Sequence, residues 1–402
     1  LEAAGVDILN TDIGWHEARV PTIVTSVPRA AFAAFTADVT RAVNIPVCAA
    51  NRINMPATAE ELLERGDAQL VQVAGHPIEV VLRDDGGVAD ATRRLAQELV
   101  VNEKVRFLAG FGLTPLALAA APIATRAKVP QVVMAAATAA ITEQSPFIVR
   151  TSVTIPQTTT VLADWAARNG VRRMATLVTD YGPGIDAETW LKNRFTEAGG
   201  RAVESLRVPL QNPDFAPFLQ RARDAAPEAL FAFVPSGVGS VLMRQFVERG
   251  LDKAGIRLIA LGDVTDDDIL NGMGDAALGV VTAHHYSAAH DSAENRRFVE
   301  GFRRLANGGR PNFMAVGGYD GMALICKAVE AAGAAADGAQ LVEAMKGMAW
   351  ESPRGPVAID ARTREMVQNI YIRRVERVGG ELFNVEFDTF PAVGDPAKNR
   401  AG

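Results

Sequence analysis

The stretch MATLVTDYGPG occupies residues 174–184 and is followed by a helical pattern of apolar residues at 187–198. Its first five residues form a short run typical of a buried strand, and the glycines and the proline that follow favour a tight connection. A buried strand that leads directly into a helix is the repeating unit of parallel sheets. This stretch therefore predicts one βα unit.

The same alternation extends along the chain in both directions. Other short apolar runs predict strands at 6–9, 45–49, 78–82, 107–109, 131–134, 230–234 and 258–260. Helical patterns lie between them at 91–102, 158–169, 215–225, 239–249, 293–305 and 321–332. After Pro353 the pattern changes to extended segments at 357–360 and 367–373, with Gly379-Gly380 as a hairpin signal. We therefore expect an α/β fold with parallel sheets that ends in β-structure.

Length and charge limit the class of protein. A chain of 402 residues is too long for one ordinary core, so two or more domains are expected. The net charge of -6 and the absence of a Lys/Arg block leave no footprint for nucleic acid. The longest apolar stretch, at 129–142, is shorter than the roughly 20 residues that cross a bilayer. No basic segment followed by an apolar one opens the chain, so no export signal is visible.

Two segments have the placement of an anion-binding site, because each follows a predicted strand and precedes a predicted helix. They are Gly112-Leu113-Thr114-Pro115 and Ala136-Ala137-Thr138. A helix start offers free N–H groups and a favourable dipole, and the Thr114 and Thr138 hydroxyls add donors. The small side chains of Ala136 and Ala137 would let a ligand approach the backbone. The alternative is that both segments are ordinary helix caps.

Three polar or aromatic residues follow other predicted strands. Tyr181 follows the strand at 174–178, Ser236 follows the strand at 230–234, and Asp263 follows the strand at 258–260. Each is a candidate ligand contact. The alternative for Tyr181 is a turn aromatic, and for Asp263 and the acidic run at 266–268 it is a favourable interaction with the dipole of the next helix.

No set of residues indicates catalysis or metal binding. His284, His285 and His290 match no zinc-ligand spacing, and no cysteine lies near them. The chain has no P-loop, no dinucleotide fingerprint and no nucleophile elbow. We therefore expect no enzyme activity, no cofactor and no metal.

From about residue 74 to the end, the chain resembles the leucine/isoleucine/valine-binding branch of the periplasmic solute-binding proteins. The motifs that carry this resemblance are Gly75-His76-Pro77-Ile78-Glu79-Val80-Val81, Asp84-Asp85, Ala109-Gly110-Phe111-Gly112, Ala135-Ala136-Ala137-Thr138, Thr179-Asp180-Tyr181-Gly182-Pro183-Gly184, Gly274-Asp275-Ala276-Ala277 and Gly317-Gly318-Tyr319-Asp320-Gly321. The resemblance implies a type I two-lobed fold, with 73–153 plus 284–352 as lobe I and 154–283 plus 353–402 as lobe II.

The same resemblance implies a function. It predicts a monomeric periplasmic protein that captures a small carboxylate-bearing solute by hinge closure and delivers it to an ABC permease in the inner membrane. Tyr181 would close over the ligand, and Asp263 would pair with an amino group of a branched-chain or other amino acid. An aromatic or other non-amino carboxylate is the alternative. Segments 151–156 and 280–286 would cross between the lobes, which would bring His285 or Tyr286 to the cleft.

Residues 1 to about 71 resemble a different family, the 2,4-dienoyl-CoA reductases of the old yellow enzyme group. The matching segments are 10–19, 21–23, 27–29, 51–54 and 65–68. In that family the histidine matching His16 serves proton chemistry beside flavin, and the arginine matching Arg52 lies near the cofactor. Only about a quarter of a TIM-like barrel is present, so 1–72 is predicted to be a βα fragment that holds no flavin. Flavin-dependent reduction is the alternative function of another class.

The chain lacks the first strand that this family of binding proteins usually has before 78–82. We hypothesise that the strand predicted at 6–9 or the one at 45–49 takes its place in the sheet of the first lobe.

Overall fold

The computed structural model describes residues 9–11, 30–43, 47–49, 62–63, 65–66, 70–73 and 76–398. The chain forms two compact units. One comprises Leu1–Asp84 and Met322–Met345, and the other comprises Asp85–Gly321 and Lys346–Gly402.

The first unit contains a small sheet of its own, with strand order β1-β2-β3-β4. Its elements are β1 (Leu9–Thr11), α1 (Ala33–Ala42), β2 (Val47–Ala49), β3 (Leu70–Val73), β4 (His76–Pro77) and α11 (Gly338–Met345). β1 and β2 pair in parallel, and β2 pairs with β3. The hypothesis that one of the early strands completes the sheet of the first lobe is therefore wrong.

The strand predicted at 78–82 does not form, because residues 78–82 have no regular secondary structure. Val80 and Leu82 are 69% and 84% exposed. An apolar run becomes a strand only when a neighbouring strand satisfies its backbone groups, and its composition alone does not supply that neighbour.

The second unit contains a three-stranded parallel sheet with order β5-β6-β7. It consists of β5 (Leu108–Gly110), β6 (Gln131–Val133) and β7 (Ile148–Arg150), with α3 (Ala89–Val101), α4 (Thr114–Ala127) and the 3-10 helix η2 (Ala139–Gln144). Two apolar clusters pack this part: one contains Ala96, Leu108, Ala120, Ile123 and Ala124, and the other contains Ala117, Ala121, Val133, Ala136, Ile141 and Ile148.

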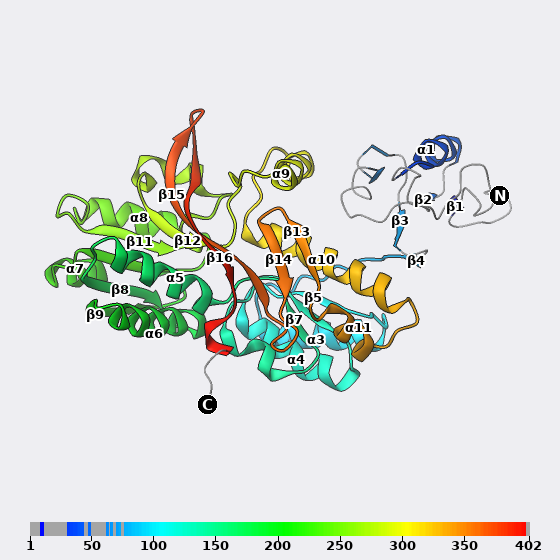
Figure 1. The fold of residues 1–402 in the computed structure, drawn as a ribbon, viewed down its shortest axis with the longest axis horizontal. Coiled ribbons are helices and arrows are strands. Elements are labelled where there is room, and N and C mark those ends of the chain that lie inside the picture. Colours follow the sequence, from blue (N-terminus) through cyan, green and yellow to red (C-terminus); the bar gives the residue numbers. More distant parts are fainter. Residues whose placement is uncertain are drawn as a thin grey trace. The chain divides into compact units, whose positions relative to one another are not determined.

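The same unit contains a nine-stranded mixed sheet with order β13-β14-β15-β12-β11-β10-β8-β9, in which β16 also pairs with β15. The strands are β8 (Arg173–Thr179), β9 (Arg201–Val208), β10 (Ala229–Phe233), β11 (Arg257–Leu261), β12 (Val281–His284), β13 (Ala349–Ser352), β14 (Gly355–Ile359), β15 (Met366–Val378) and β16 (Glu381–Val393). β8 to β12 run parallel, and β13 to β16 are antiparallel additions. β15 and β16 turn at Gly379-Gly380 and form the long red hairpin of Figure 1, as predicted.

Helices pack on the large sheet, and short 3-10 turns follow β11 and β16. The other helices are α5 (Ile155–Arg168), α6 (Gly182–Glu197), α7 (Ala216–Asp224), α8 (Gly239–Glu248), α9 (Ala293–Leu305) and α10 (Phe313–Ala332), of which α10 is divided between the two units after Gly321. The 3-10 turns are η3 (Gly262–Thr265), η4 (Leu270–Ala277) and η5 (Pro396–Lys398). Within the residues that the structure describes, no helix is both long and apolar enough to cross a membrane.

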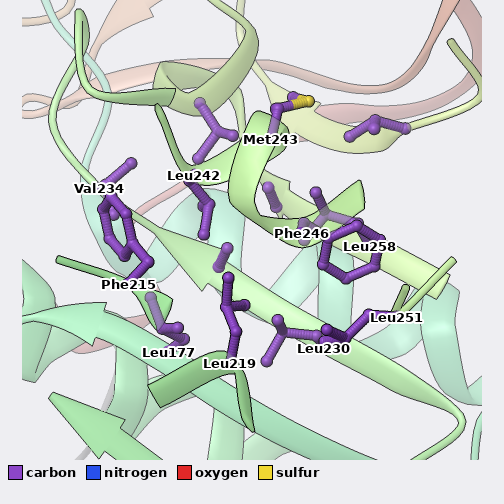
Figure 2. Packing of buried hydrophobic residues seen from close by; sticks show 14 of the residues in the cluster. Leu177, Phe215, Leu219, Leu230, Val234, Leu242, Met243, Phe246, Leu251 and Leu258 are labelled. Atoms are coloured by element: carbon purple, nitrogen blue, oxygen red, sulfur yellow. The ribbon is translucent and has the colours of Figure 1, made fainter. Parts of the chain in front are cut away.

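The central strand β10 shows why these sequences form parallel strands. All five of its residues are buried, and they alternate between the two faces of the sheet. Leu230 and Ala232 join the cluster shown in Figure 2, where Phe215, Leu219 and the helix α8 side chains meet them. Ala229, Phe231 and Phe233 join the opposite cluster with α5 and α6. The sheet is therefore the middle layer of a three-layer sandwich.

Helix α10 begins at Phe313, eight residues before the predicted start at 321. Gly317 and Gly318 weaken the helical signal because glycine is a poor helix former. The packing requires a small residue at 317, since a Cβ there would lie 2.1 Å from the carbonyl oxygen of Met134. Gly317 thus weakens the prediction of a helix from the sequence, but it allows α10 to lie close to the end of β6.

Candidate ligand-binding site

A narrow cavity of about 50 Å3 lies within the second unit, at the carboxyl ends of strands from both of its sheets. The residues that line it are Gly112, Leu113, Thr114, Ala135, Ala136, Ala137, Val153, Ile155, Thr158, Tyr181, Pro183, Phe233, Pro235, Ser236, Asp263, His284, Phe313 and Met314. Ligands of open parallel sheets usually bind at this edge. Such a volume holds only a few water molecules, so a solute enters only when the sides move apart.

The structure brings six of the seven predicted ligand contacts to this cavity: Thr114, Ala136, Ala137, Tyr181, Ser236 and Asp263. The seventh, Thr138, lies directly behind, with its Oγ1 2.8 Å from Oγ1 of Thr114. These residues follow five separate strands, β5, β6, β8, β10 and β11, so the rule that links strand ends to binding sites brought them to one cavity.

The small-sheet side of the cavity is built to receive an anion. Thr114 is the first residue of α4, and the first N–H groups of a helix have no acceptor within the helix. Pro115 follows it and fits this position because it has no N–H to satisfy. The hydroxyls of Thr114 and Thr138 are hydrogen-bonded to each other, which uses the proton of one hydroxyl and leaves the proton of the other as a donor. A carboxylate placed here would face both a helix dipole and hydroxyl groups.

The second predicted anion segment differs from expectation. Ala136-Ala137-Thr138 precede the six-residue 3-10 helix η2, not an α-helix. The N–H of Ala136 already donates to the carbonyl of Phe111 at 2.9 Å, and its own carbonyl accepts from Nη1 of Arg150. The backbone of Ala136 is therefore engaged in holding the loop, and its contribution to the cavity is a small side chain.

Aromatic rings form much of the rest of the lining. The rings of Tyr181 and Phe233 are parallel within 2° and their centroids lie 6.3 Å apart. The ring of Phe313, at the start of α10, meets the His284 ring edge-on at 5.1 Å. Burial beside Asp263 raises the pKa of the Tyr181 hydroxyl, which therefore stays protonated. These aromatic rings suit a flat, apolar body in the ligand.

One carboxylate, that of Asp263, also lines the cavity. Oδ2 of Asp263 is 3.8 Å from Nε2 of His284. Burial raises the pKa of Asp263 to about 6, an effect that a backbone N–H and Arg373 oppose. Burial also holds the pKa of His284 well below its usual range. At neutral pH the pair is a carboxylate beside a neutral imidazole, ready to accept a hydrogen bond from a ligand.

The acidic run at 266–268 is not a solvated helix start. Asp266 and Asp267 are buried, and the helix that follows is the 3-10 turn η4. Asp266 accepts from Ser236, while Asp267 accepts from Asn384 and lies 3.8 Å from Arg373. The expectation of a simple dipole interaction is therefore wrong for these two residues.

The sequence did not predict that Phe233, His284 and Phe313 line the cavity. It predicted His285 or Tyr286 at the cleft in place of His284. Tyr286 instead donates to Asn295, and His285 is buried outside the lining. Phe233 carried a usable signal, because it closes the same strand that Ser236 follows. Among the residues that the structure describes, no three His, Cys, Asp or Glu side chains gather as a metal site.

A family model described as periplasmic binding protein matches residues 29–381, so the chain belongs to that family. The fold is the two-lobed type I fold of these proteins, and the chain is a solute-binding protein of an ABC transporter. Members of this non-enzymatic family bind small molecules and work with a membrane permease, and the family implies a periplasmic location. The match begins well before residue 74, where the resemblance was expected to start.

Three relatives are similar over most of the chain. A Leu/Ile/Val-binding protein homolog 6 from Brucella melitensis is 47% identical over 329 residues, which are 81% of this chain and 84% of that one. A solute-binding protein from Rhodopseudomonas palustris BisB5, in complex with 3,4-dihydroxybenzoic acid, is 53% identical, with 98% of both chains covered and a TM-score of 0.81. Another from R. palustris HaA2, in complex with p-hydroxybenzoic acid, is 37% identical, with the same coverage and TM-score.

The reductase resemblance of residues 1–72 is not established by the comparisons. A metal reductase from Desulforamulus reducens is 43% identical over 74 residues, which are 18% of this chain and 11% of that protein. So short a match does not establish a reductase family, and His16 and Arg52 lie outside the described residues. The reductase origin of 1–72 stays a prediction.

Proposed function

We propose that this protein captures a hydroxylated aromatic carboxylate in the periplasm and delivers it to an inner-membrane ABC permease. The observation that carries the proposal is the set of groups that line one cavity. Donors at the start of α4 suit the carboxylate, the rings of Tyr181, Phe233 and Phe313 suit a flat body, and Asp263 suits a hydroxyl. A para-hydroxybenzoate has all three features.

The bound ligands of two relatives support the same ligand class. The R. palustris proteins described above hold 3,4-dihydroxybenzoic acid and p-hydroxybenzoic acid, and the first is 53% identical to this chain. A phenol hydroxyl gives Asp263 the donor that a buried carboxylate needs.

A branched-chain or other amino acid is the second candidate. It is favoured by the same Asp263, which would pair with an ammonium group, and by the name of the Brucella relative. The aromatic residues of the lining favour the hydroxybenzoate over the amino acid. The parallel rings of Tyr181 and Phe233 suit a flat ligand, whereas an aliphatic side chain needs only an apolar pocket.

Direct binding measurements test the proposal. Isothermal titration with 4-hydroxybenzoate, 3,4-dihydroxybenzoate, benzoate and leucine is expected to give micromolar or tighter dissociation constants for the hydroxybenzoates, about -8 kcal/mol or better. A saturating hydroxybenzoate at about 100 times Kd should stabilise the folded protein by about 2.7 kcal/mol. Tight binding of leucine without binding of either hydroxybenzoate would overturn the proposal in favour of the second candidate.

We further propose that the protein is a monomer that closes by hinge motion, with lobe I formed by 73–153 plus 284–352 and lobe II by 154–283 plus 353–402. One contact beside the cavity joins an element of the small sheet to one that packs on the large sheet. The N–H of Ala139, at the start of η2, donates to Oδ2 of Asp186 on α6 at 3.3 Å. Closure would form this bond and opening would break it.

Replacing Asp186 with Ala is therefore expected to weaken 4-hydroxybenzoate binding about fivefold. The loss corresponds to about 1 kcal/mol, the usual worth of one such hydrogen bond, and it should appear mainly as faster dissociation. Stopped-flow dissociation and titration measure the two quantities. Asp180→Ala is the control, because Asp180 is 59% exposed and lies 3.8 Å from Arg207. Equal effects of the two substitutions would contradict a closing role for Asp186.

A further inference from the structure

Ser236 lines the cavity beside the residue that would hold the ligand's para-hydroxyl. It lies in the loop between β10 and α8, while Asp263 lies in η3. The two segments are in direct contact, since a Cβ at Gly239 would lie 2.0 Å from the carbonyl oxygen of Val264. Because Ser236 and Asp263 both line the cavity, a para-hydroxyl bound to Asp263 leaves Ser236 as a polar side chain for a substituent at the neighbouring meta position.

Asn312, the residue before α10, determines which groups donate and which accept in the hydrogen bonds behind Ser236. Oδ1 of Asn312 accepts from the backbone N–H groups of Met314 and Ala315, both at 3.0 Å. Backbone N–H groups only donate, so this side of the amide must be the oxygen. The amide nitrogen of Asn312 therefore faces Oδ2 of Asp266, at 3.3 Å, as a donor.

Asp266 in turn fixes the hydroxyl of Ser236. Its Oδ1 accepts from the N–H of Asp267, and its Oδ2 accepts from Asn312 and, at 2.6 Å, from Oγ of Ser236. Asp266 is buried, and donors stand at both of its oxygens. Burial raises the pKa of Asp266, and the hydrogen bond from Ser236 opposes that rise. As long as Asp266 is a carboxylate, the Ser236 proton is directed at it, which leaves only lone pairs of Ser236 for the cavity.

We infer that Ser236, oriented by Asp266, selects ligands that carry a hydrogen-bond donor at the ring position next to the para-hydroxyl. This inference rests on the proposed function. A meta-hydroxyl donates its proton to Oγ of Ser236. A meta-fluorine has no proton and turns its negative end toward the same lone pairs. The preferred solute is therefore a 3,4-dihydroxybenzoate, and a 3-fluoro-4-hydroxybenzoate of nearly the same shape is disfavoured.

Titration of three ligands into the wild type and Ser236→Ala tests this selection. The wild type is expected to bind 3,4-dihydroxybenzoate about tenfold more tightly than 4-hydroxybenzoate, and the 3-fluoro analogue more weakly than either. In Ser236→Ala the affinity for 3,4-dihydroxybenzoate should fall about tenfold, while the affinity for 4-hydroxybenzoate changes by less than about twofold. The fluoro ligand should then bind this variant as tightly as 4-hydroxybenzoate does. Comparing each ligand across both proteins removes the effect of fluorine on the acidity of the phenol.

Ser240→Ala is the matched control, because Ser240 lies on α8 and does not line the cavity. This control should keep the wild-type order. An unchanged order in Ser236→Ala would overturn selection by Ser236 while leaving the proposed function intact. The ratio of fluoro-ligand affinity to 4-hydroxybenzoate affinity should be lower in the wild type than in Ser236→Ala. A ratio that is equal or higher in the wild type would overturn the assigned polarity, and a higher ratio would show that Ser236 donates a proton to the ligand. Failure of all three ligands to bind the wild type would overturn the proposed function and this inference with it.

Discussion

Replacing Arg354 with Ala is expected to lower the free energy of unfolding by about 3–5 kcal/mol, the usual cost of leaving one member of a buried ion pair unpaired. Nη2 of Arg354 lies 2.7 Å from Oδ2 of Asp320, and neither side chain is exposed. The same carboxylate accepts from Nε1 of Trp350 and Oγ of Ser352, both at 2.9 Å. Burial already raises the pKa of Asp320, and Arg354 opposes that rise.

The pair also supports the candidate site. Asp320 lies on α10, whose first residues line the cavity, and Arg354 donates to the carbonyl of Thr151, on the segment that leads to Val153. Loss of Arg354 should therefore loosen both the start of α10 and this segment.

Urea unfolding measures the effect, and the chain provides a matched control. Arg296 pairs with Asp291 at 2.6 Å, but the two side chains are 66% and 95% exposed. Arg296→Ala should change stability by less than about 0.5 kcal/mol. Replacing both members of the buried pair, as Arg354→Met with Asp320→Leu, should recover part of the loss, because no charge is then left unpaired. A loss in Arg354→Ala as small as in Arg296→Ala would contradict a structural role for the buried pair.

Much of the fold could be predicted because its signals are local. The strands β6, β8, β10 and β11 and the helices around them lie within a few residues of their predicted bounds. The failures depend on partners that lie elsewhere in the chain. Residues 78–82 have the composition of a strand without a neighbour to pair with, and α10 contains glycines that only its packing against Met134 explains.

The residues of the candidate site also differ in whether the sequence could predict them. Residues just after a strand were predictable, because the carboxyl ends of parallel strands meet at one edge. Phe313 was not, since its position depends on where α10 begins. The choice between His284 and His285 depends on which face of the sheet each residue takes, and a one-residue shift exchanges the faces. That register is fixed by the pairing of His284 with Tyr371.

Binding of 4-hydroxybenzoate is expected to be strongest above about pH 7 and to weaken as the pH falls through about 6. Burial raises the pKa of Asp263 to about 6, so above that pH the group is a carboxylate that accepts the phenol proton. Below it the group gains a proton and loses its charge. A group with a pKa of about 6 is still a carboxylate in about one molecule in ten at pH 5, so affinity should fall by up to about tenfold between pH 8 and pH 5, within the range of about 1.5–3 kcal/mol that a hydrogen bond to a charged group is worth. Titration at a series of pH values measures this, and Asp263→Asn should bind weakly at every pH.

The role of Asp263 is isolated by combining two ligands with two proteins. Benzoate lacks the hydroxyl and leaves the buried carboxylate unpaired, so the wild type should bind benzoate about 10- to 100-fold more weakly than 4-hydroxybenzoate. In Asp263→Ala that preference should largely disappear, because neither ligand then leaves a charge unpaired. The coupling between hydroxyl and carboxylate would be about 1.5–3 kcal/mol. An amino acid as the true ligand predicts another result: Asp263→Ala would abolish leucine binding, and benzoate and 4-hydroxybenzoate would bind equally poorly to both proteins.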